Sequence, residues 1–108
     1  MEKVENYCIV YCNTDSNENA ELIANSLITD KLAACVSIIP KVISIYTWEN
    51  QIDKRNEYML MVKTALNKLD LIEKKIKELH NDNVPEIISI KIENISKDYL
   101  NWMEDSLK

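Results

Sequence analysis

The chain has 108 residues, of which 46% are hydrophobic and 29% are charged, proportions that are ordinary for a globular domain. Its net charge of −5 argues against nucleic acid as a partner, because binding of phosphates needs a basic surface. The chain contains no glycine, which excludes the glycine-rich loops that bind nucleotide phosphates. We therefore expect no nucleotide cofactor.

Length and hydropathy predict one domain, residues 1–108, with no membrane partner. A chain of this length buries about two-thirds of its unfolded surface, which is enough for a core. No run reaches the roughly 18 apolar residues of a membrane span, and the polar start MEKVENY is unlike a signal peptide. We expect a cytoplasmic protein, or an organellar one if a targeting segment has been removed. Cys8, Cys12 and Cys35 lack C-x-x-C spacing, so we expect free thiols.

The first two elements expected along the chain are a strand and a helix. The segment Tyr7–Cys12 is apolar on both alternating sets of residues, which favours a central strand. Asp15 and Ser16 are candidate N-caps for a helix that ends near Asp30. The apolar positions of this helix recur at helical spacing: Ala20, Ile23, Ala24, Leu27 and Ile28.

A long β-hairpin is expected next, with runs Leu32–Trp48 and Arg55–Lys63 joined by a turn at Glu49 and Asn50. Asn50 is well suited to this turn because asparagine tolerates positive φ. The first run is apolar on both faces, and its roughly 17 residues would extend about 55 Å even with a kink at Pro40. A domain of this size is about 35 Å across. We therefore expect other copies of the chain to cover the hairpin in a homo-oligomer.

The second half of the chain predicts a helix, a strand and a final helix. We expect Thr64 to cap the first of these helices, Asn81–Asn83 to form a turn before Pro85, and Ser96 to cap the last helix. Between them lies an expected strand, Ile87–Glu93. The apolar positions of the two helices are Leu69, Ile72, Ile76 and Leu79, and then Tyr99, Trp102, Met103 and Leu107. This order predicts an α+β fold: a ferredoxin-like βαββαβ sandwich with an extended hairpin between its second and third strands and a C-terminal helix.

Few residues indicate chemistry by themselves. His80, the only histidine, ends a predicted helix, where it either interacts with the helix dipole or serves as a ligand. Glu57 and Lys63 share one face of an otherwise apolar strand, so each needs a partner, either the other residue or a ligand. A single histidine and the absence of an oriented nucleophile–base pair argue against catalysis. We expect no enzyme and no catalytic residues.

Several separated segments nevertheless carry a family resemblance. KLAACVSIIPKVISIYTWENQI, EYMLMVKT, HNDNVPEI and YLNWM resemble, in order and spacing, the CutA divalent-cation tolerance proteins over nearly the whole chain, from Tyr7 to Trp102. The resemblance implies the ferredoxin-like fold and a homotrimer in which the long hairpins pack around a threefold axis. It also implies a role in tolerance to divalent cations, with binding of copper or another divalent metal ion.

The resemblance further implies where ligands bind. Cys12 matches a position linked to soft-metal binding in some members, and with His80 it forms the expected metal site. Thiolate and imidazole suit copper or zinc, and further ligands would come from water, a neighbouring subunit or a carboxylate such as Glu57. A polar cleft between subunits is expected from five residues: Trp48, Glu57, Lys63, His80 and Glu86.

The chain departs from the family pattern at Asn81, Asp82 and Asn83, where the usual residues are Pro, Tyr and Glu. The departure removes a tyrosine from the expected cleft and adds an oxygen ligand at Asp82. Two other functions are compatible with the residues. One is a trimeric signalling protein similar to the nitrogen-regulatory PII proteins, which would bind an anionic small molecule through Lys63; the other is a ligand-free trimeric scaffold. An unidentified protein partner is compatible with all of these functions.

Overall fold

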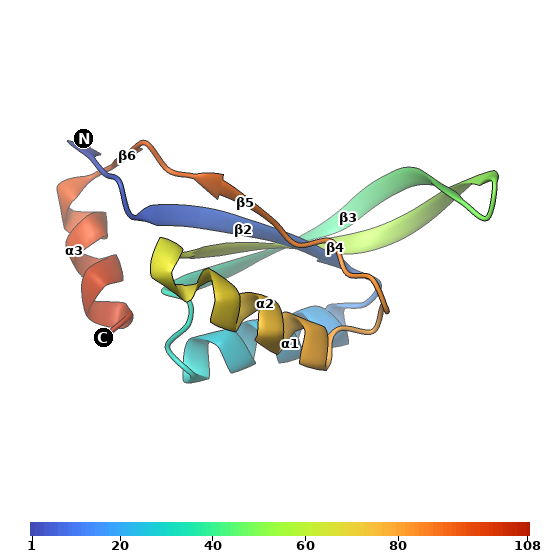
Figure 1. Ribbon diagram of the computed structural model, residues 1–108, viewed down its shortest axis with the longest axis horizontal. Helices are drawn as coiled ribbons and strands as arrows, with labels where there is room; N and C mark the ends of the chain where they lie inside the picture. Colours follow the sequence, from blue (N-terminus) through green and yellow to red (C-terminus); the bar gives the residue numbers. More distant parts are fainter.

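The computed structural model describes residues 1–108 and contains a four-stranded antiparallel sheet with two helices on one face (Figure 1). The strands follow the order β3-β4-β2-β5 across the sheet. They are β2 (Tyr7–Thr14), β3 (Cys35–Trp48), β4 (Gln51–Ala65) and β5 (Ile88–Lys91). The two covering helices are α1 (Asn17–Thr29) and α2 (Leu69–Leu79). This arrangement confirms the predicted ferredoxin-like α+β fold, with β2 in the interior of the sheet as expected.

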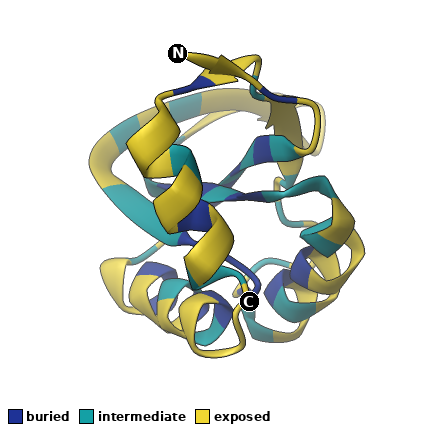
Figure 2. Cartoon of the chain, turned by 90° about the vertical axis from the view of Figure 1, so that its left-hand side faces the viewer, coloured by how far each residue is buried: buried dark blue, intermediate teal, exposed yellow.

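A smaller unit closes the end of the molecule where both termini lie (Figure 1). Strand β1 (Glu2–Lys3) pairs with β6 (Asn94–Ile95) in a two-stranded sheet, which the sequence reasoning did not anticipate. Helix α3 (Lys97–Ser106) packs beside it and buries Met103. The outward surface of α3 is exposed (Figure 2). The predicted C-terminal helix is therefore present, and it covers the end of the sheet while α1 and α2 cover one face.

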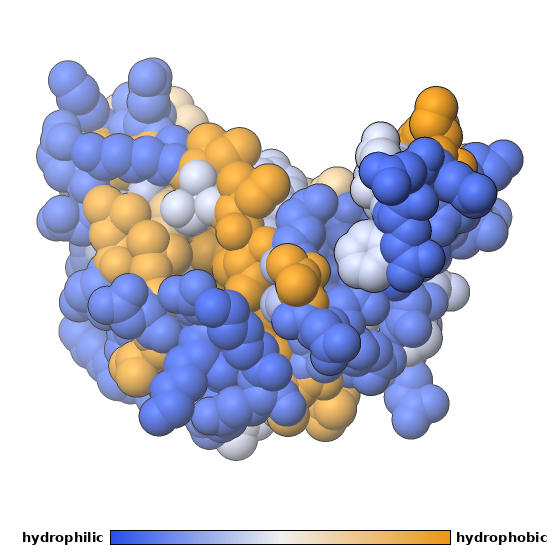
Figure 3. Space-filling view, turned by 45° about the vertical axis from the view of Figure 1, so that its right-hand side comes forward, coloured by the Kyte–Doolittle hydropathy of each residue, from blue (hydrophilic) through white to orange (hydrophobic).

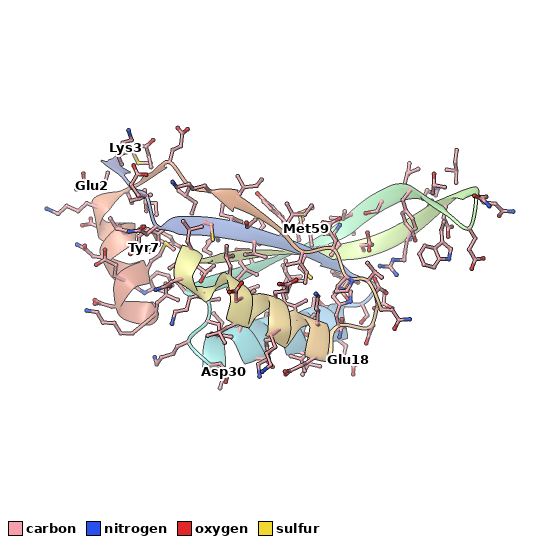
Figure 4. All side chains as sticks on the ribbon, in the orientation of Figure 1. Glu2, Lys3, Tyr7, Glu18, Asp30 and Met59 are labelled. Carbon is pink, nitrogen blue, oxygen red and sulfur yellow. The ribbon has the colours of Figure 1, made fainter.

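The hydrophobic core lies between the sheet and the pair α1 and α2. Burial of a large aliphatic side chain contributes about 1.5–3 kcal/mol, so a few such residues account for much of the stability. The largest buried members are Val10, Ile23, Leu27, Leu60, Ile72 and Ile76. An ion pair between Lys75 of α2 and Asp30, which follows α1, joins the two helices at 3.0 Å. Figure 4 labels Asp30 and Glu18 near opposite ends of α1.

The helix starts agree with the sequence in part. Ser16 is the N-cap of α1, and its Oγ accepts a hydrogen bond from the Asn19 backbone N–H at 3.1 Å. The prediction that Thr64 caps the next helix is wrong. Thr64 lies within β4, where its buried hydroxyl donates to the Leu32 carbonyl at 2.6 Å. Strand β4 continues two residues beyond the run expected from its apolar pattern and ends at Ala65. A 3-10 turn, η1 (Leu66–Lys68), then separates β4 from α2.

The hairpin formed by β3 and β4 projects beyond the helices (Figure 1). A register shift between Ile39 and Val42 interrupts the ladder around Pro40, where proline cannot donate a hydrogen bond. We call the part beyond this irregularity, residues 42–57, the arm; Met59, labelled in Figure 4, lies near its root. At the tip, Glu49 and Asn50 both have positive φ, 51° and 64°, the pattern of a type I′ turn. The molecule is 46 Å long but only 25 and 23 Å in its other dimensions.

The arm leaves many of its apolar side chains in contact with solvent. Ile45 is 68% exposed, Ile52 is 83% exposed and Trp48 is 59% exposed. In Figure 3 the arm projects at the upper right with an apolar group near its tip, while the larger apolar area of this view lies over the body of the molecule. The chain by itself does not cover both faces of the hairpin.

Candidate functional site

A pocket of about 770 Å³ opens at the root of the arm, where the loop that follows α2 passes close to β4 (Figure 1). The arm contributes Tyr46 and Trp48 to the lining, and the end of β2 contributes Asn13. The ionisable residues of the lining are four carboxylic acids and one arginine: Asp53, Glu57, Asp82, Glu86 and Arg55. Four negative charges face one positive charge, so the pocket favours a cationic ligand over an anionic one.

Arg55 joins the arm to the loop after α2. Its Nη1 and Nη2 donate to the two carboxylate oxygens of Asp82 at 3.1 and 2.6 Å, a bidentate geometry that strengthens such pairs. Its Nε and Nη2 also donate to Glu57 Oε2 at 3.1 and 2.6 Å. Hydrogen bonding to Arg55 lowers the pKa of Asp82 against the opposing effect of burial. The three side chains therefore form a charged clasp that holds the root of the arm.

Asn13 lines the pocket and is 6% exposed. Its Nδ2 donates to Glu57 Oε1 at 3.5 Å, which sets the orientation of the amide, because the opposite orientation would place two oxygens together. Its Oδ1 is buried and accepts no hydrogen bond. A buried carbonyl oxygen without a donor costs about 1–3 kcal/mol. A residue of the pocket lining therefore carries an unsatisfied acceptor, which a donor or cation that reached it would satisfy.

His80 holds the loop against the end of β2. Its Nε2 lies 2.7 Å from the Asn13 carbonyl oxygen, and its Nδ1 accepts from the Asp82 backbone N–H at 2.9 Å. These two partners require a neutral ring with the proton on Nε2. Both nitrogens are therefore engaged, and neither presents a free lone pair to a metal ion.

Asn19 of α1 fixes the start of the same loop from the other side. Its Nδ2 donates to the carbonyl of Leu79, the last residue of α2, at 3.0 Å. Its Oδ1 accepts from the Asn81 backbone N–H at 3.3 Å and from the Thr14 hydroxyl at 2.5 Å. One buried side chain thus satisfies polar groups from the end of α2, the loop and β2.

Cys12 is fully buried behind the pocket. Burial raises the pKa of its thiol to about 12, with further contributions from the negative charges of Glu86, Asp82 and Glu57. The thiol is therefore protonated at neutral pH, whereas metal binding needs a thiolate. The same field that opposes the thiolate favours a cation in the pocket.

Lys63 lies elsewhere on the sheet. Its ammonium donates to Ser37 Oγ at 2.9 Å and to Cys35 Sγ at 3.7 Å. The pairing of Glu57 with Lys63, one of the two alternatives considered for these charges, does not form, because six residues of one strand hold them about 20 Å apart; Glu57 pairs with Arg55 instead. Cys35 is only half-buried and lies near Tyr99 of α3, whose pKa is raised by burial and then by Cys35.

The structure thus brings together part of the residue set expected for the cleft. Trp48, Glu57 and Glu86 line one pocket, and His80 contacts the backbone of two other lining residues, Asn13 and Asp82, but Lys63 does not line it. The sequence reasoning missed the residues that organise the pocket. Arg55 could have been found, because it lies two residues before Glu57 and strand periodicity places both side chains on one face. Asn13 and Asp53 gave no comparable signal.

The departure from the expected family motif also has a structural consequence. Asp82 binds Arg55, while Asn81 Nδ2 donates to Asp15 Oδ1 at 2.9 Å. These polar residues tie the loop to the arm and to the segment before α1. No group of three or more His, Cys, Asp or Glu side chains in the chain is arranged to hold a metal ion.

The fold and the pocket define a class: a ferredoxin-like α+β protein with a projecting hairpin and an acidic pocket at its root. Comparison with known families assigns the chain within that class. It belongs to the CutA1 divalent ion tolerance protein family, whose model matches residues 8–106.

Individual relatives agree with this assignment. The divalent-cation tolerance protein CutA of Thermus thermophilus is 35% identical over 98 residues, which are 91% of this chain and 95% of that protein. The crystal structure of CutA1 from Oryza sativa superposes with a TM-score of 0.93 at 34% identity, over 98% of this chain and 96% of that one.

A chloroplastic relative is longer than this chain. Protein CutA 1, chloroplastic, of Oryza sativa is 35% identical over 100 residues, which are 93% of this chain but only 56% of the relative's length. No helix of the present structure has the length and apolar character needed to cross a membrane.

Proposed function

We propose that the chain acts in tolerance to divalent cations as a homotrimer that takes up a divalent metal ion, copper among them, in the pocket at the root of the arm. The observation that carries this proposal is the charge of the pocket lining, in which four carboxylates face one guanidinium. Family membership supports the role, and the excess of negative charge supports the placement of the ion.

The donor atoms of the pocket suit an ion bound through oxygen. Carboxylate oxygens are available from Asp53 and Glu86, and the buried amide oxygen of Asn13 has no partner, whereas Arg55 occupies Asp82 and one oxygen of Glu57. Oxygen ligands favour hard cations, and copper(II) also accepts oxygen and nitrogen ligands. Because three acidic side chains do not already converge on one point, water or a neighbouring subunit would complete the coordination.

The thiolate–imidazole site expected from the sequence fits less well. The Cys12 thiol has a pKa raised to about 12, and both ring nitrogens of His80 have partners within the chain. Metal binding there would have to displace the thiol proton and break the hydrogen bond between His80 and Asp82 or Asn13. We therefore place the ion among the oxygens of the pocket and treat Cys12 and His80 as the alternative ligands.

The arm supports the proposed homotrimer. Strand β3 lies at the edge of the sheet, and its outer residues Ile43 and Ile45 are more than half exposed. A long, exposed apolar edge strand is prone to aggregation unless another chain pairs with it or covers it. Further copies of the same chain, each with its own arm, would supply that cover.

The proposal is tested by calorimetric titration of Cu²⁺, Zn²⁺ and Mn²⁺ into the reduced, tag-free protein, with the assembly mass measured by light scattering. We expect saturable binding to a trimer that weakens at least about tenfold in Glu86→Gln and is retained in Cys12→Ala and His80→Gln. Thermal unfolding of each variant controls for loss of fold. Binding lost only in Cys12→Ala or His80→Gln would contradict the placement in the pocket, and no metal binding at all would contradict the function.

A further inference from the structure

We propose that the same pocket binds an organic dication, an aliphatic diamine or polyamine whose ammonium groups meet its carboxylates. The inference deepens the proposed function, because it names a second class of divalent cation for the pocket on which that function rests. Three features of the lining carry it: an unsatisfied buried acceptor, two carboxylates without ion-pair partners, and an aromatic wall.

The unsatisfied acceptor is Asn13 Oδ1. It is buried, accepts no hydrogen bond and belongs to a residue that lines the pocket. The contact between Asn13 Nδ2 and Glu57 Oε1 directs the amide oxygen away from the carboxylate and leaves that oxygen without a donor from the protein. An ammonium group has three N–H donors, so one that reaches the buried Asn13 Oδ1 after a small side-chain movement would still have donors for a carboxylate.

The unpaired carboxylates are Asp53 and Glu86. Arg55 forms ion pairs with Glu57 and Asp82, while Asp53 and Glu86 form no salt bridge within the chain. The lining thus retains two negative charges that no protein cation neutralises, beyond the charge that Glu57 shares with Arg55. A ligand with two positive charges separated by several atoms matches a site in which the acidic groups surround a space and do not converge on a point.

The aromatic wall suits the hydrocarbon part of such a ligand. Tyr46, Trp48, Ile45 and Val84 line the same pocket as the acids. Methylene groups pack on apolar side chains, and an ammonium over an indole face gains about 0.5–2 kcal/mol. The pocket volume of about 770 Å³ lies in the range of small-molecule sites, roughly 300–1,000 Å³, and far exceeds the space that a single ion fills.

Tryptophan fluorescence gives a direct test because the chain has only two tryptophans. Trp48 lines the pocket, whereas Trp102 is on α3 and does not. In a Trp102→Phe background, Trp48 alone reports on binding. The assembled protein is titrated with 1,4-diaminobutane and spermidine at constant ionic strength, and 1-aminobutane serves as the singly charged control.

We expect saturable changes in Trp48 fluorescence and affinities for the diamine at least about tenfold above that for 1-aminobutane. Asp53→Asn, Glu86→Gln and Asn13→Ala should each weaken diamine binding several-fold. Asp105→Asn, which alters an exposed acid on α3, should leave it unchanged. Far-ultraviolet circular dichroism and thermal unfolding of each variant establish that the fold is retained.

Absence of a saturable response at millimolar diamine would overturn the inference, as would equal affinity for the diamine and 1-aminobutane. Retention of full diamine affinity in the Asp53→Asn, Glu86→Gln double variant would overturn it as well. Calorimetric metal titration of the same protein separates the two proposals. Metal binding without diamine binding refutes the organic ligand and leaves the proposed function intact, whereas diamine binding without metal binding refutes the metal and leaves the organic ligand.

Discussion

The body of the molecule and its arm are built from the same two long strands but differ in what covers them. In the body, β4 buries Leu60 and Val62 against α1 and α2. In the arm, β3 and β4 pair only with each other, and residues such as Ile45 and Ile52 remain exposed. Isolated two-stranded hairpins are marginally stable in water. The body therefore carries its own stability, while within the chain the arm depends on its ladder and on the clasp at its root.

The pocket lies at the boundary between these two regions, and both contribute to it. Asp53, Arg55 and Glu57 come from the arm, while Asn13 and Asp82 belong to the body. The geometry of the pocket thus depends on how the arm is held. A ligand that binds both sides would restrict the arm, and an assembly that fixes the arm would preorganise the pocket.

The largest expected effect follows from weakening the body. Ile76 is fully buried in the core between α2 and the sheet, so Ile76→Ala should lower the free energy of unfolding by about 2–5 kcal/mol. Leu71→Ala, on the same helix but at a position 54% exposed, should change it by less than about 0.5 kcal/mol. Urea unfolding followed by circular dichroism measures both. Equal effects of the two substitutions would show that α2 does not pack as described.

The secondary structure of the body was predicted best from the sequence, because the spacing of its apolar residues reflects which side chains are buried. The helical spacing of Ile23 and Leu27, and of Ile72 and Ile76, records which side of each helix faces the sheet. Ser16, one of the two predicted candidate caps, could be found because its role depends only on residues three positions away. Thr64 was predicted wrongly because its partner, the Leu32 carbonyl, is 32 residues distant and no local pattern identifies it.

The site was less predictable because its residues converge from distant segments. Glu57 was found as a charge on an apolar strand face, and Trp48 and Glu86 were found through family resemblance, yet their common pocket depends on Arg55 and Asn13, which no motif indicated. The free acceptor of Asn13 is a property of three-dimensional packing, since it follows from the position of Glu57 on another strand. His80 was expected as a ligand, but its neighbours Asn13 and Asp82 use both of its nitrogens.

A smaller effect is expected from opening the clasp at the root of the arm. Asp82→Asn removes the negative charge from a bidentate pair with Arg55. A hydrogen bond to a charged group contributes about 1.5–3 kcal/mol. Because Asp82 is partly exposed, we expect the free energy of unfolding to fall by about 1–2 kcal/mol at neutral pH. The pKa of Asp82 is lowered in the folded state, so the folded protein binds fewer protons than the unfolded one near pH 4 and below. The stabilisation is therefore complete above the unfolded pKa and is lost as the pH falls through the folded value.

Chemical denaturation at a series of pH values measures this difference between wild type and Asp82→Asn. The two proteins should converge in stability as the pH falls below about 4. Asp105→Asn, which breaks the exposed contact with Lys108, is the matched control and should show almost no difference at any pH. A constant gap between wild type and Asp82→Asn down to the lowest pH would mean that the clasp contributes through packing and not through charge.

The smallest effect on the stability of a single chain is expected from a substitution in the arm. For such a substitution, the oligomeric state is the more sensitive measurement. Ile45 is 68% exposed and pairs across the hairpin with Lys54, so Ile45→Ala should change the stability of a dissociated chain by less than about 0.5 kcal/mol. If other copies cover the arm, the same substitution removes apolar area buried at every interface and costs about 1.5–3 kcal/mol at each covered site. Light scattering over a dilution series should then show dissociation at higher protein concentration than in wild type.

Lys54→Ala is the control, because it alters the neighbouring position across the ladder without removing a large apolar side chain. It should leave the dissociation of the assembly close to that of wild type. Because folding of an assembled protein is linked to its association, the melting temperature of wild type should also rise with protein concentration. An Ile45→Ala protein that dissociates like wild type would place the interface away from this face of the arm, and the exposed isoleucines would then have to be covered by another partner.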